Sequence, residues 1–219
     1  MFELIIEALR QHAGHTGVVS VCCTLLRNLS AGDAENKRLL GDLGACSAVV
    51  RATRRHPNDE GIQRASASAL WNLTAGNNDN KQASGQVAAN TLAAAIRRHV
   101  RVAPVVEPVL GALASVLPAL LLNTIGHAPA GAATDSDDVN VRDIIAVMRL
   151  HASNLLVQTR ALAVLLCLCK NDAAHRTAMK EAGGNASNHA CSLAVHLQHA
   201  CTIVLCHFAL ARAVGKRPK

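Results

Sequence analysis

The chain carries two closely similar segments, Leu25-Leu26-Arg27-Asn28-Leu29-Ser30-Ala31-Gly32 and Ala69-Leu70-Trp71-Asn72-Leu73-Thr74-Ala75-Gly76. An Asn-Lys pair follows each of them at the same distance, as Asn36-Lys37 and Asn80-Lys81. Asn72 stands 44 positions after Asn28, and Asn80 stands 44 positions after Asn36. Self-similarity at a fixed period of this size indicates a stack of supersecondary units.

A histidine that closes an apolar-periodic segment marks the same period. It recurs as His12, His56, His99, His151 and His199, at steps of 44, 43, 52 and 48 positions. Arginine stands two places before the first four of these, at Arg10, Arg54, Arg97 and Arg149. The spacing is close to the roughly 40–47 residues of two- and three-helix repeats. We expect a structural role for the recurring histidines at helix C-termini, because positive charge is favourable there.

Each unit reads as three helices. The first is short and is predicted at Asn36–Leu43, Asn80–Val87 and Ala174–Ala182. The second carries apolar residues three and four apart, as in 45–52, and ends at the Arg-Arg-His marker. The third is predicted at Gly61–Leu73. Its predicted buried face consists of Ile62, Ala65, Ala69, Leu70 and Leu73.

The combined pattern resembles the armadillo repeat. The residues that carry the likeness are Gly44-Ala45, Pro57-Asn58-Asp59-Glu60, Ile62-Gln63 and the Ala-Leu-Trp-Asn-Leu-Thr segment. The likeness is strong over 18–99 and weaker over 141–213, and the histidine-terminated second helix is similar to the armadillo-repeat-containing protein six type. The resemblance implies an all-α, right-handed superhelical solenoid of four to five partial repeats, with the third helices lining a concave face. The expected units are 2–32, 33–76, 77–116, 117–171 and 172–213.

The middle of the chain departs from this pattern. Residues 102–122 are apolar enough to suggest a membrane span. The repeat register instead predicts a third helix, interrupted by prolines, and we expect no membrane contact. Pro118 is predicted to separate this helix from a short one at Ala119–Ile125, and 127–138 is predicted to be an exposed acidic loop.

Composition limits the chemistry that is expected. The 219-residue chain has one Trp, two Phe and no Tyr, so aromatic platforms for single-stranded nucleic acid are nearly absent. Its eight cysteines fall at helix-core spacings and predict buried free thiols in a reducing, intracellular compartment, with the cytoplasm first and cilium or organelle matrix as alternatives. Cys167, Cys169 and His175 suggest a metal site, but residues two apart on a helix point to different faces. We therefore expect no metal, no cofactor and no small-molecule substrate.

The net charge of +7 arises in part from a predicted basic edge of the solenoid, at the turn after each second helix. This edge comprises Arg51, Arg54, Arg55, Arg97, Arg98 and Arg101, and a basic tail follows at 214–219. The edge is interpreted as solvated helix ends, with an acidic protein or an RNA backbone as alternative partners.

The resemblance also implies a binding role for the third helices. In armadillo proteins that hold extended peptides, an asparagine on each third helix bonds the peptide backbone, which carries over to Asn28 and Asn72 only. Ala112 and Cys167 stand at the equivalent places later in the chain. Thr24 and Ser68 stand where nuclear-import receptors have tryptophan, so binding of nuclear-localisation signals is not expected.

Trp71 is predicted to project into the concave groove, with packing against the neighbouring repeat as the alternative. The predicted partner-binding set is therefore Arg27, Asn28, Trp71 and Asn72. Apolar residues near both ends, namely Phe2, Leu4, Ile5, Phe208 and Leu210, predict that other protein subunits cover the ends of the solenoid.

The sequence therefore predicts a non-enzymatic protein-interaction scaffold or structural subunit, with no catalytic residues. Two alternatives remain. One is a basic structural subunit of a ribonucleoprotein or organellar complex that contacts RNA phosphates. The other is a metal-dependent enzyme built on the Cys and His residues.

Overall fold

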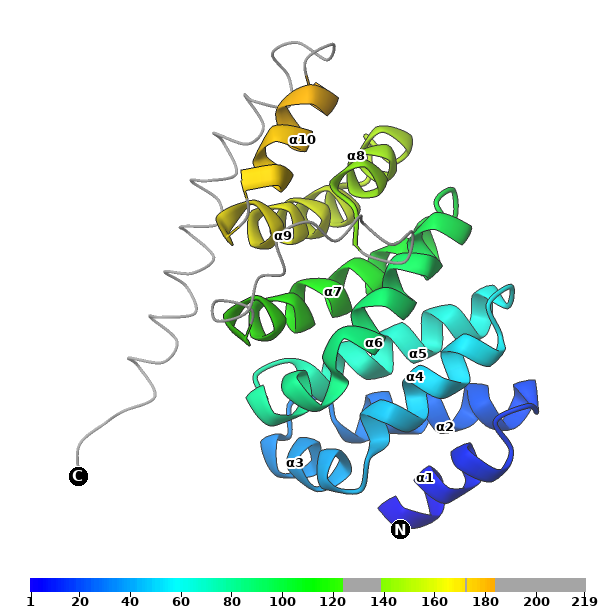
Figure 1. Ribbon diagram of the computed structural model, residues 1–219. Helices are drawn as coiled ribbons and strands as arrows, with labels where there is room; N and C mark the ends of the chain where they lie inside the picture. The colour runs from blue at the N-terminus through cyan, green and yellow to red at the C-terminus, as the bar shows by residue number, and fades with distance from the viewer. Residues whose placement is uncertain (124–138, 172, 184–219) are drawn as a thin grey trace, which may run out of the picture.

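In the part of the chain that the structure describes, ten α-helices are stacked along one axis (Figure 1). The computed structural model describes residues 1–123, 139–171 and 173–183. In order along the chain, the helices are α1 (Phe2–Gln11), α2 (Thr16–Leu29), α3 (Ala34–Asp42), α4 (Ala45–Arg55), α5 (Glu60–Thr74), α6 (Asn78–Arg98), α7 (Ala103–Asn123), α8 (Val141–Leu150), α9 (Leu155–Asn171) and α10 (Ala173–Gly183).

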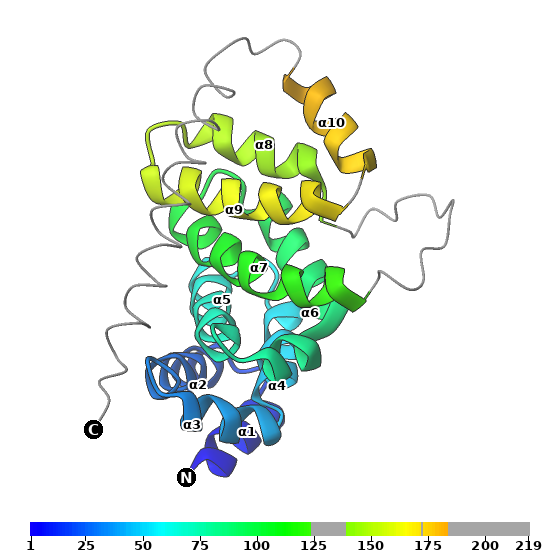
Figure 2. The same cartoon turned by 90° about the vertical axis from the view of Figure 1, so that its left-hand side faces the viewer.

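The helices form two main layers that follow the sequence repeat. The third helices of successive units, α2, α5, α7 and α9, pack side by side, and the second helices, α1, α4, α6 and α8, form the other layer (Figure 2). Leu26, Leu70, Leu113 and Leu165 are buried where the layers meet. The chain is thus an all-α solenoid, as the repeat predicts. The core is built from Ala, Val, Leu, Ile and Cys side chains, whose small size allows close approach of neighbouring helices.

The helix boundaries follow from local capping chemistry. Asp33, Asp59 and Asn77 are N-caps whose side chains accept a hydrogen bond from a backbone N–H of the first turn. Gly44 ends α3 and begins α4 with a φ of 80°, a left-handed conformation that disfavours any residue with a Cβ. Gly44 thus separates the short helix from the one that follows it.

The recurring histidines join each unit to the one before it. His56 Nε2 lies 2.7 Å from the Ala13 carbonyl oxygen, His99 Nε2 lies 2.8 Å from that of Pro57, and His151 Nε2 lies 2.7 Å from that of Val100. A carbonyl oxygen can only accept, so Nε2 is the protonated nitrogen in each ring. In every case the acceptor is the residue directly after the C-cap histidine of the preceding unit. His56, His99 and His151 therefore have the structural role that their spacing predicts, while His199 lies outside the described residues.

A buried amide adds a second bond of this kind. Asn80 is 3 % exposed, and its Nδ2 donates to the carbonyls of Lys37 and Leu73 at 2.8 and 2.9 Å. Its Oδ1 lies directly against Gly41, where any added Cβ would overlap it. Asn80 therefore helps to hold its unit against the preceding one, and Gly41 leaves the space that its amide occupies.

One expected helix boundary is wrong. The predicted break at Pro118 does not occur, because α7 continues through it to Asn123. Proline removes one hydrogen bond from the helix, but Val116 and Leu117 on one side and Ala119 on the other are buried, and their burial offsets that loss. The short helix predicted at Asn80–Val87 and the helix after it are joined within α6 across a kink at Gly85, whose φ of 58° and ψ of −167° are non-helical, so the predicted break lies within two residues of the kink.

The other residue assignments agree closely with the structure. The predicted buried face of the third helix is confirmed at Ile62, Ala69, Leu70 and Leu73, whereas Ala65 is only partly buried. The acidic stretch 127–138 and the tail 214–219 lie outside the described residues.

By length and composition, α7 is apolar enough to cross a membrane over Ala103–Leu120. Of this window, 61 % is buried against neighbouring helices, chiefly α5, α6 and α9. Its apolar character is accounted for by packing inside the stack.

We expect His99→Ala to lower the free energy of unfolding by about 1–3 kcal/mol, because it leaves the Pro57 carbonyl without its donor inside a packed interface. His12→Ala is the matched control. His12 occupies the same place at the end of α1 but is exposed and bonds no earlier unit, so its effect should be within about 0.5 kcal/mol. Chemical denaturation of the two variants measures the difference, and equal losses would contradict the proposed role.

Candidate functional site

Trp71 lies between successive third helices and is partly buried. An added Cβ on Gly111 of α7 would come within 2.9 Å of the indole ring, so Gly111 provides the space that the ring occupies. The Arg160 guanidinium of α9 lies 4.4 Å from the ring centroid, within cation–π distance. Trp71 thus packs against the next repeat, which is the alternative that the sequence left open, and part of its surface remains exposed.

Arg160 and Glu107 complete this cluster, and sequence reasoning missed both. Arg160 Nη1 donates to Glu107 Oε1 at 2.7 Å, and the two side chains are 19 % and 31 % exposed. The pair links α7 to α9 and holds the guanidinium over the Trp71 ring. Glu107, an acidic residue inside the apolar stretch 102–122, is a sequence signal of a buried partner. Nothing in the sequence pointed to Arg160.

The structure brings the other predicted residues together at the α2–α5 interface. Asn72 Nδ2 donates to the Arg27 carbonyl at 2.9 Å, so this amide holds the preceding repeat. Asn28 is exposed, and its Oδ1 accepts from Nε and Nη2 of the Arg27 side chain at 3.2 Å each. One predicted asparagine therefore serves stacking, while the other presents its amide to solvent beside a guanidinium.

The later third helices do not extend this arrangement. Ala112 is fully buried, and Cys167 is partly buried. Neither side chain can form the paired amide bonds with a peptide backbone. The exposed polar chemistry of the third-helix face, meaning the solvent side of α2, α5, α7 and α9, is thus concentrated around α2 and α5.

The predicted basic edge lies at the C-terminal ends of α4 and α6 and in the turn after α6. Most of its arginines are exposed, namely Arg51, Arg54, Arg55, Arg98 and Arg101. Arg97 differs, because it forms an ion pair with Asp143 of α8 at 3.2 Å, and both side chains are about 30 % exposed. Arg98 Nη1 donates to Asn58 Oδ1 at 2.7 Å.

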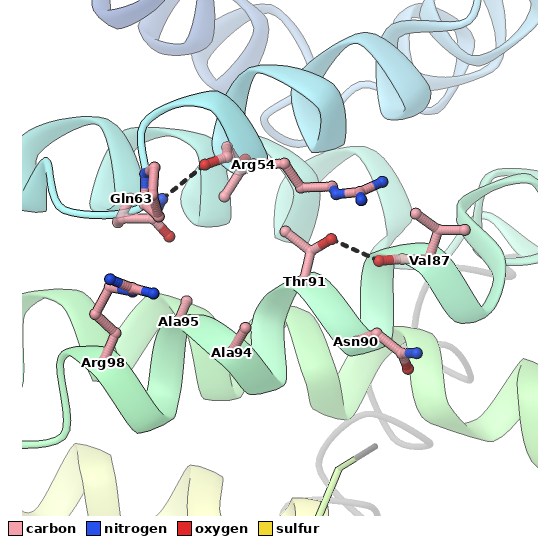
Figure 3. A pocket seen from close by; sticks show the side chains of 10 residues that line it. Arg54, Gln63, Val87, Asn90, Thr91, Ala94, Ala95 and Arg98 are labelled. Carbon is pink, nitrogen blue, oxygen red and sulfur yellow. Dashed lines mark hydrogen bonds between the residues drawn. The ribbon is translucent and has the colours of Figure 1, made fainter. Parts of the chain in front are cut away.

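A cleft of about 480 Å³ lies between α4, α6 and the start of α5, beside this edge (Figure 3). Arg54 and Arg98 line it from two consecutive second helices, and the buried Gln63 lies at its inner wall. Its volume is within the range of ligand-binding pockets. Nothing in the sequence indicated that Gln63 and Thr91 would line one cleft with these arginines.

The cysteines Cys22, Cys23 and Cys46 are buried free thiols, as predicted. Burial raises the pKa of Cys23 to about 12, and the charge of neighbouring Cys22 adds to this. Burial likewise raises the pKa of Cys46 to about 11. The expectation of full burial is wrong for Cys167 and Cys169, which are partly exposed near the end of α9. Cys191, Cys201 and Cys206 lie outside the described residues.

No three His, Cys, Asp or Glu side chains within 1–123, 139–171 and 173–183 are grouped in a way that could hold a metal ion. The raised thiol pKa values also disfavour the thiolate form that metal binding and nucleophilic chemistry require.

Residues 33–75 match the Armadillo/beta-catenin-like repeat family. The matched segment is the unit α3–α5, and the match supports the armadillo-repeat family; it does not support the finer likeness to the armadillo-repeat-containing protein six type. Armadillo repeats generally serve as non-enzymatic scaffolds for protein interactions. No curated protein matches the chain. Among solved structures, the chain is similar to an engineered protein from the Northeast Structural Genomics Consortium, with 18 % identity, a TM-score of 0.47, and coverage of 84 % of this chain and 87 % of that one.

Gly111→Ala is expected to destabilise the α5–α7 interface by about 1–2 kcal/mol, because the added Cβ displaces the Trp71 ring. Trp71 is the chain's single tryptophan and there is no tyrosine, so intrinsic fluorescence reports this ring directly. The emission spectrum should shift together with the lowered melting temperature. Gly14→Ala is the control, since its added Cβ meets only Arg55 Nη1 at 4.0 Å. An unchanged spectrum in Gly111→Ala would contradict the assigned packing.

Stability is expected to fall as the pH rises above 9. The Cys23 pKa is about 12 in the folded chain against 9.0 for the free thiol, so between these values the unfolded chain holds fewer protons and unfolding is favoured. Cys23→Val removes this titration while keeping an apolar side chain. Its melting temperature should therefore decline less between pH 8 and pH 11 than that of the natural chain. Parallel declines would show that Cys23 does not contribute.

Proposed function

We propose that this chain is a non-enzymatic protein-interaction scaffold or structural subunit that binds a partner protein through the concave face of its third helices. The proposed contact centres on Arg27 and Asn28, with Trp71 and Asn72 beside them. The proposal includes no cofactor, no small-molecule substrate and no membrane partner.

One observation carries the proposal, namely the exposed Asn28 amide beside the Arg27 side chain, on a surface that inter-repeat bonds hold in place. The Asn72 amide fixes the Arg27 backbone at 2.9 Å, so α2 and α5 present their polar groups in a constant arrangement. Asn28 Nδ2 makes no bond to a described residue, and this leaves a donor for a partner's backbone carbonyl. A rigid surface binds with a smaller loss of conformational entropy than a mobile one.

We also propose that other protein subunits cover the ends of the solenoid. At the α1–α2 end, the apolar side chains of Leu4, Val21 and Leu25 are 75 %, 60 % and 41 % exposed, while Phe2 and Ile5 are partly buried. Phe208 and Leu210 lie outside the described residues. Exposed apolar groups that form a contiguous patch are typical of interaction sites.

A reducing, intracellular compartment is part of the proposal, with the cytoplasm first and cilium or organelle matrix as alternatives. Its support is the set of buried free thiols on α2 and α4.

The double variant Arg27→Ala, Asn28→Ala is expected to reduce partner recovery by about tenfold, as for loss of a central interface contact. Both side chains are exposed, so the melting temperature should change little. Affinity capture with quantitative mass spectrometry measures recovery, and Gln82→Ala, an exposed change on α6, is the matched control. Recovery of the same partners at equal levels by all three proteins would refute the proposed face.

The alternative of an RNA-contacting subunit is favoured by the exposed arginines of the basic edge. If RNA is the partner, affinity should fall steeply with salt, by roughly one unit of logarithmic slope for each phosphate contacted. Arg51→Gln and Arg101→Gln, measured on single-stranded RNA across a salt series, should then each reduce that slope. A partner held by Arg27 and Asn28 should show neither effect.

A further inference from the structure

The arginine that precedes the cap histidine by two places is in a different environment in each of the helices α1, α4 and α6. Arg10 Nη2 donates to the Leu43 carbonyl at 2.8 Å, and Arg97 pairs with Asp143 of the following second helix at 3.2 Å. Arg54, the equivalent residue of α4, makes no hydrogen bond or ion pair with any described residue. A guanidinium without a carboxylate thus lies at the α4–α6 interface.

The repeat register shows which group is missing. Asp143 stands eight places before His151 on α8, and the same place on α6, eight before His99, is occupied by Thr91. Thr91 lines the cleft together with Arg54, and its Oγ1 donates to the Val87 carbonyl at 2.6 Å (Figure 3). At one interface an internal aspartate neutralises the arginine. At the α4–α6 interface, the short uncharged side chain of Thr91 leaves the Arg54 charge without a partner and leaves the cleft open.

Gln63 adds an acceptor to the inner wall of the same cleft. Its Nε2 donates to the carbonyls of Thr53 and His56, each at 2.9 Å, so both amide hydrogens are used. These two bonds fix the orientation of the amide, because the reversed orientation would place its oxygen against two carbonyls. Oε1 therefore points toward the cleft, as Figure 3 shows, and no described group donates to it. The residue is 2 % exposed.

The residues that line the cleft suit a negatively charged peptide segment whose backbone N–H groups can donate hydrogen bonds. Arg54 and Arg98 supply guanidinium groups, which bind carboxylates in a planar, two-point manner. Val87, which is 55 % exposed, and Ala94 supply apolar contact, and none of the lining residues is acidic. No aromatic residue lines the cleft, so it lacks the stacking surface on which single-stranded RNA bases bind.

We propose that this cleft binds an acidic segment of a partner protein. A carboxylate of the segment occupies the place that Asp143 fills in the next repeat and pairs with Arg54. A second carboxylate pairs with Arg98, and a main-chain N–H of the segment donates to Gln63 Oε1. The site is on the second-helix layer, away from Arg27 and Asn28, and does not depend on the function proposed above.

Thr91→Asp provides a direct test, because it supplies from within the chain the carboxylate that the ligand is proposed to bring. A library of displayed peptides is selected on the natural chain. The recovered peptides are then labelled, and their affinities for the natural chain and the variants are measured by fluorescence polarisation. The selected sequences are expected to be enriched in Asp and Glu. Thr91→Asp and Arg54→Gln should each weaken their binding by about tenfold or more.

Thr91→Asn is the matched control, since asparagine has the shape of aspartate without its charge, and it should change affinity by less than about threefold. Thr91→Asp should keep or raise the melting temperature, because it forms an ion pair with Arg54 like that between Arg97 and Asp143. Arg54→Gln removes an exposed, unpaired side chain and should fold normally.

Several results would overturn the proposal. These are recovery of no acidic peptides, peptide affinity that is unchanged in Thr91→Asp and Arg54→Gln, or equal losses in Thr91→Asp and Thr91→Asn. RNA binding that is lost in Thr91→Asp while acidic peptides fail to bind would assign the cleft to phosphates instead. The Arg27→Ala, Asn28→Ala variant should bind the selected peptides normally, so failure of the concave-face proposal and failure of this one give different results.

Discussion

The last carbonyl groups of a helix have no backbone N–H donor within the helix. In this protein, side chains from later in the sequence donate hydrogen bonds to several carbonyl groups at or just after helix ends. His56, His99 and His151 each reach the carbonyl just after the preceding unit's cap histidine. Gln63 bonds two carbonyls at the end of α4, and Asn80 bonds two carbonyls of the preceding unit, one near the end of α5 and one in α3. An unsatisfied buried carbonyl is costly, so these bonds fix the register in which one unit stacks on the next. Apolar burial drives the stacking, while the polar bonds determine its geometry.

The need for contacts between units also decides which side chains remain available for a partner. Asn28 and Asn72 are equivalent in sequence, yet Asn72 is engaged with the Arg27 backbone and Asn28 is exposed. Trp71 is likewise held between Gly111 and Arg160, so much of its surface contributes to the stack. In a solenoid, a residue on the third-helix face faces both the solvent and a neighbouring unit, and the neighbour's shape determines how it is used.

Charge follows a similar rule on the second-helix layer. Arginine recurs at one register position, but its environment depends on a single residue of the following helix. Asp143 neutralises Arg97, whereas Thr91 leaves Arg54 uncompensated beside a cleft. One residue of the following helix therefore decides whether the recurring arginine forms an internal ion pair or is left available for a partner.

The sequence by itself determined the all-α solenoid, the period and most helix boundaries, because these depend on apolar spacing, capping residues and glycine stops that are local in the chain. It also predicted the structural role of the histidines, since their spacing equals the repeat. Only the tertiary structure decided that α7 continues through Pro118, because burial on both sides of the proline offsets the lost hydrogen bond. The tertiary structure was also needed to find the Trp71–Arg160–Glu107 cluster and the cleft at Arg54. The residues of each come from different repeats, and packing, not sequence spacing, sets the relative positions of those repeats.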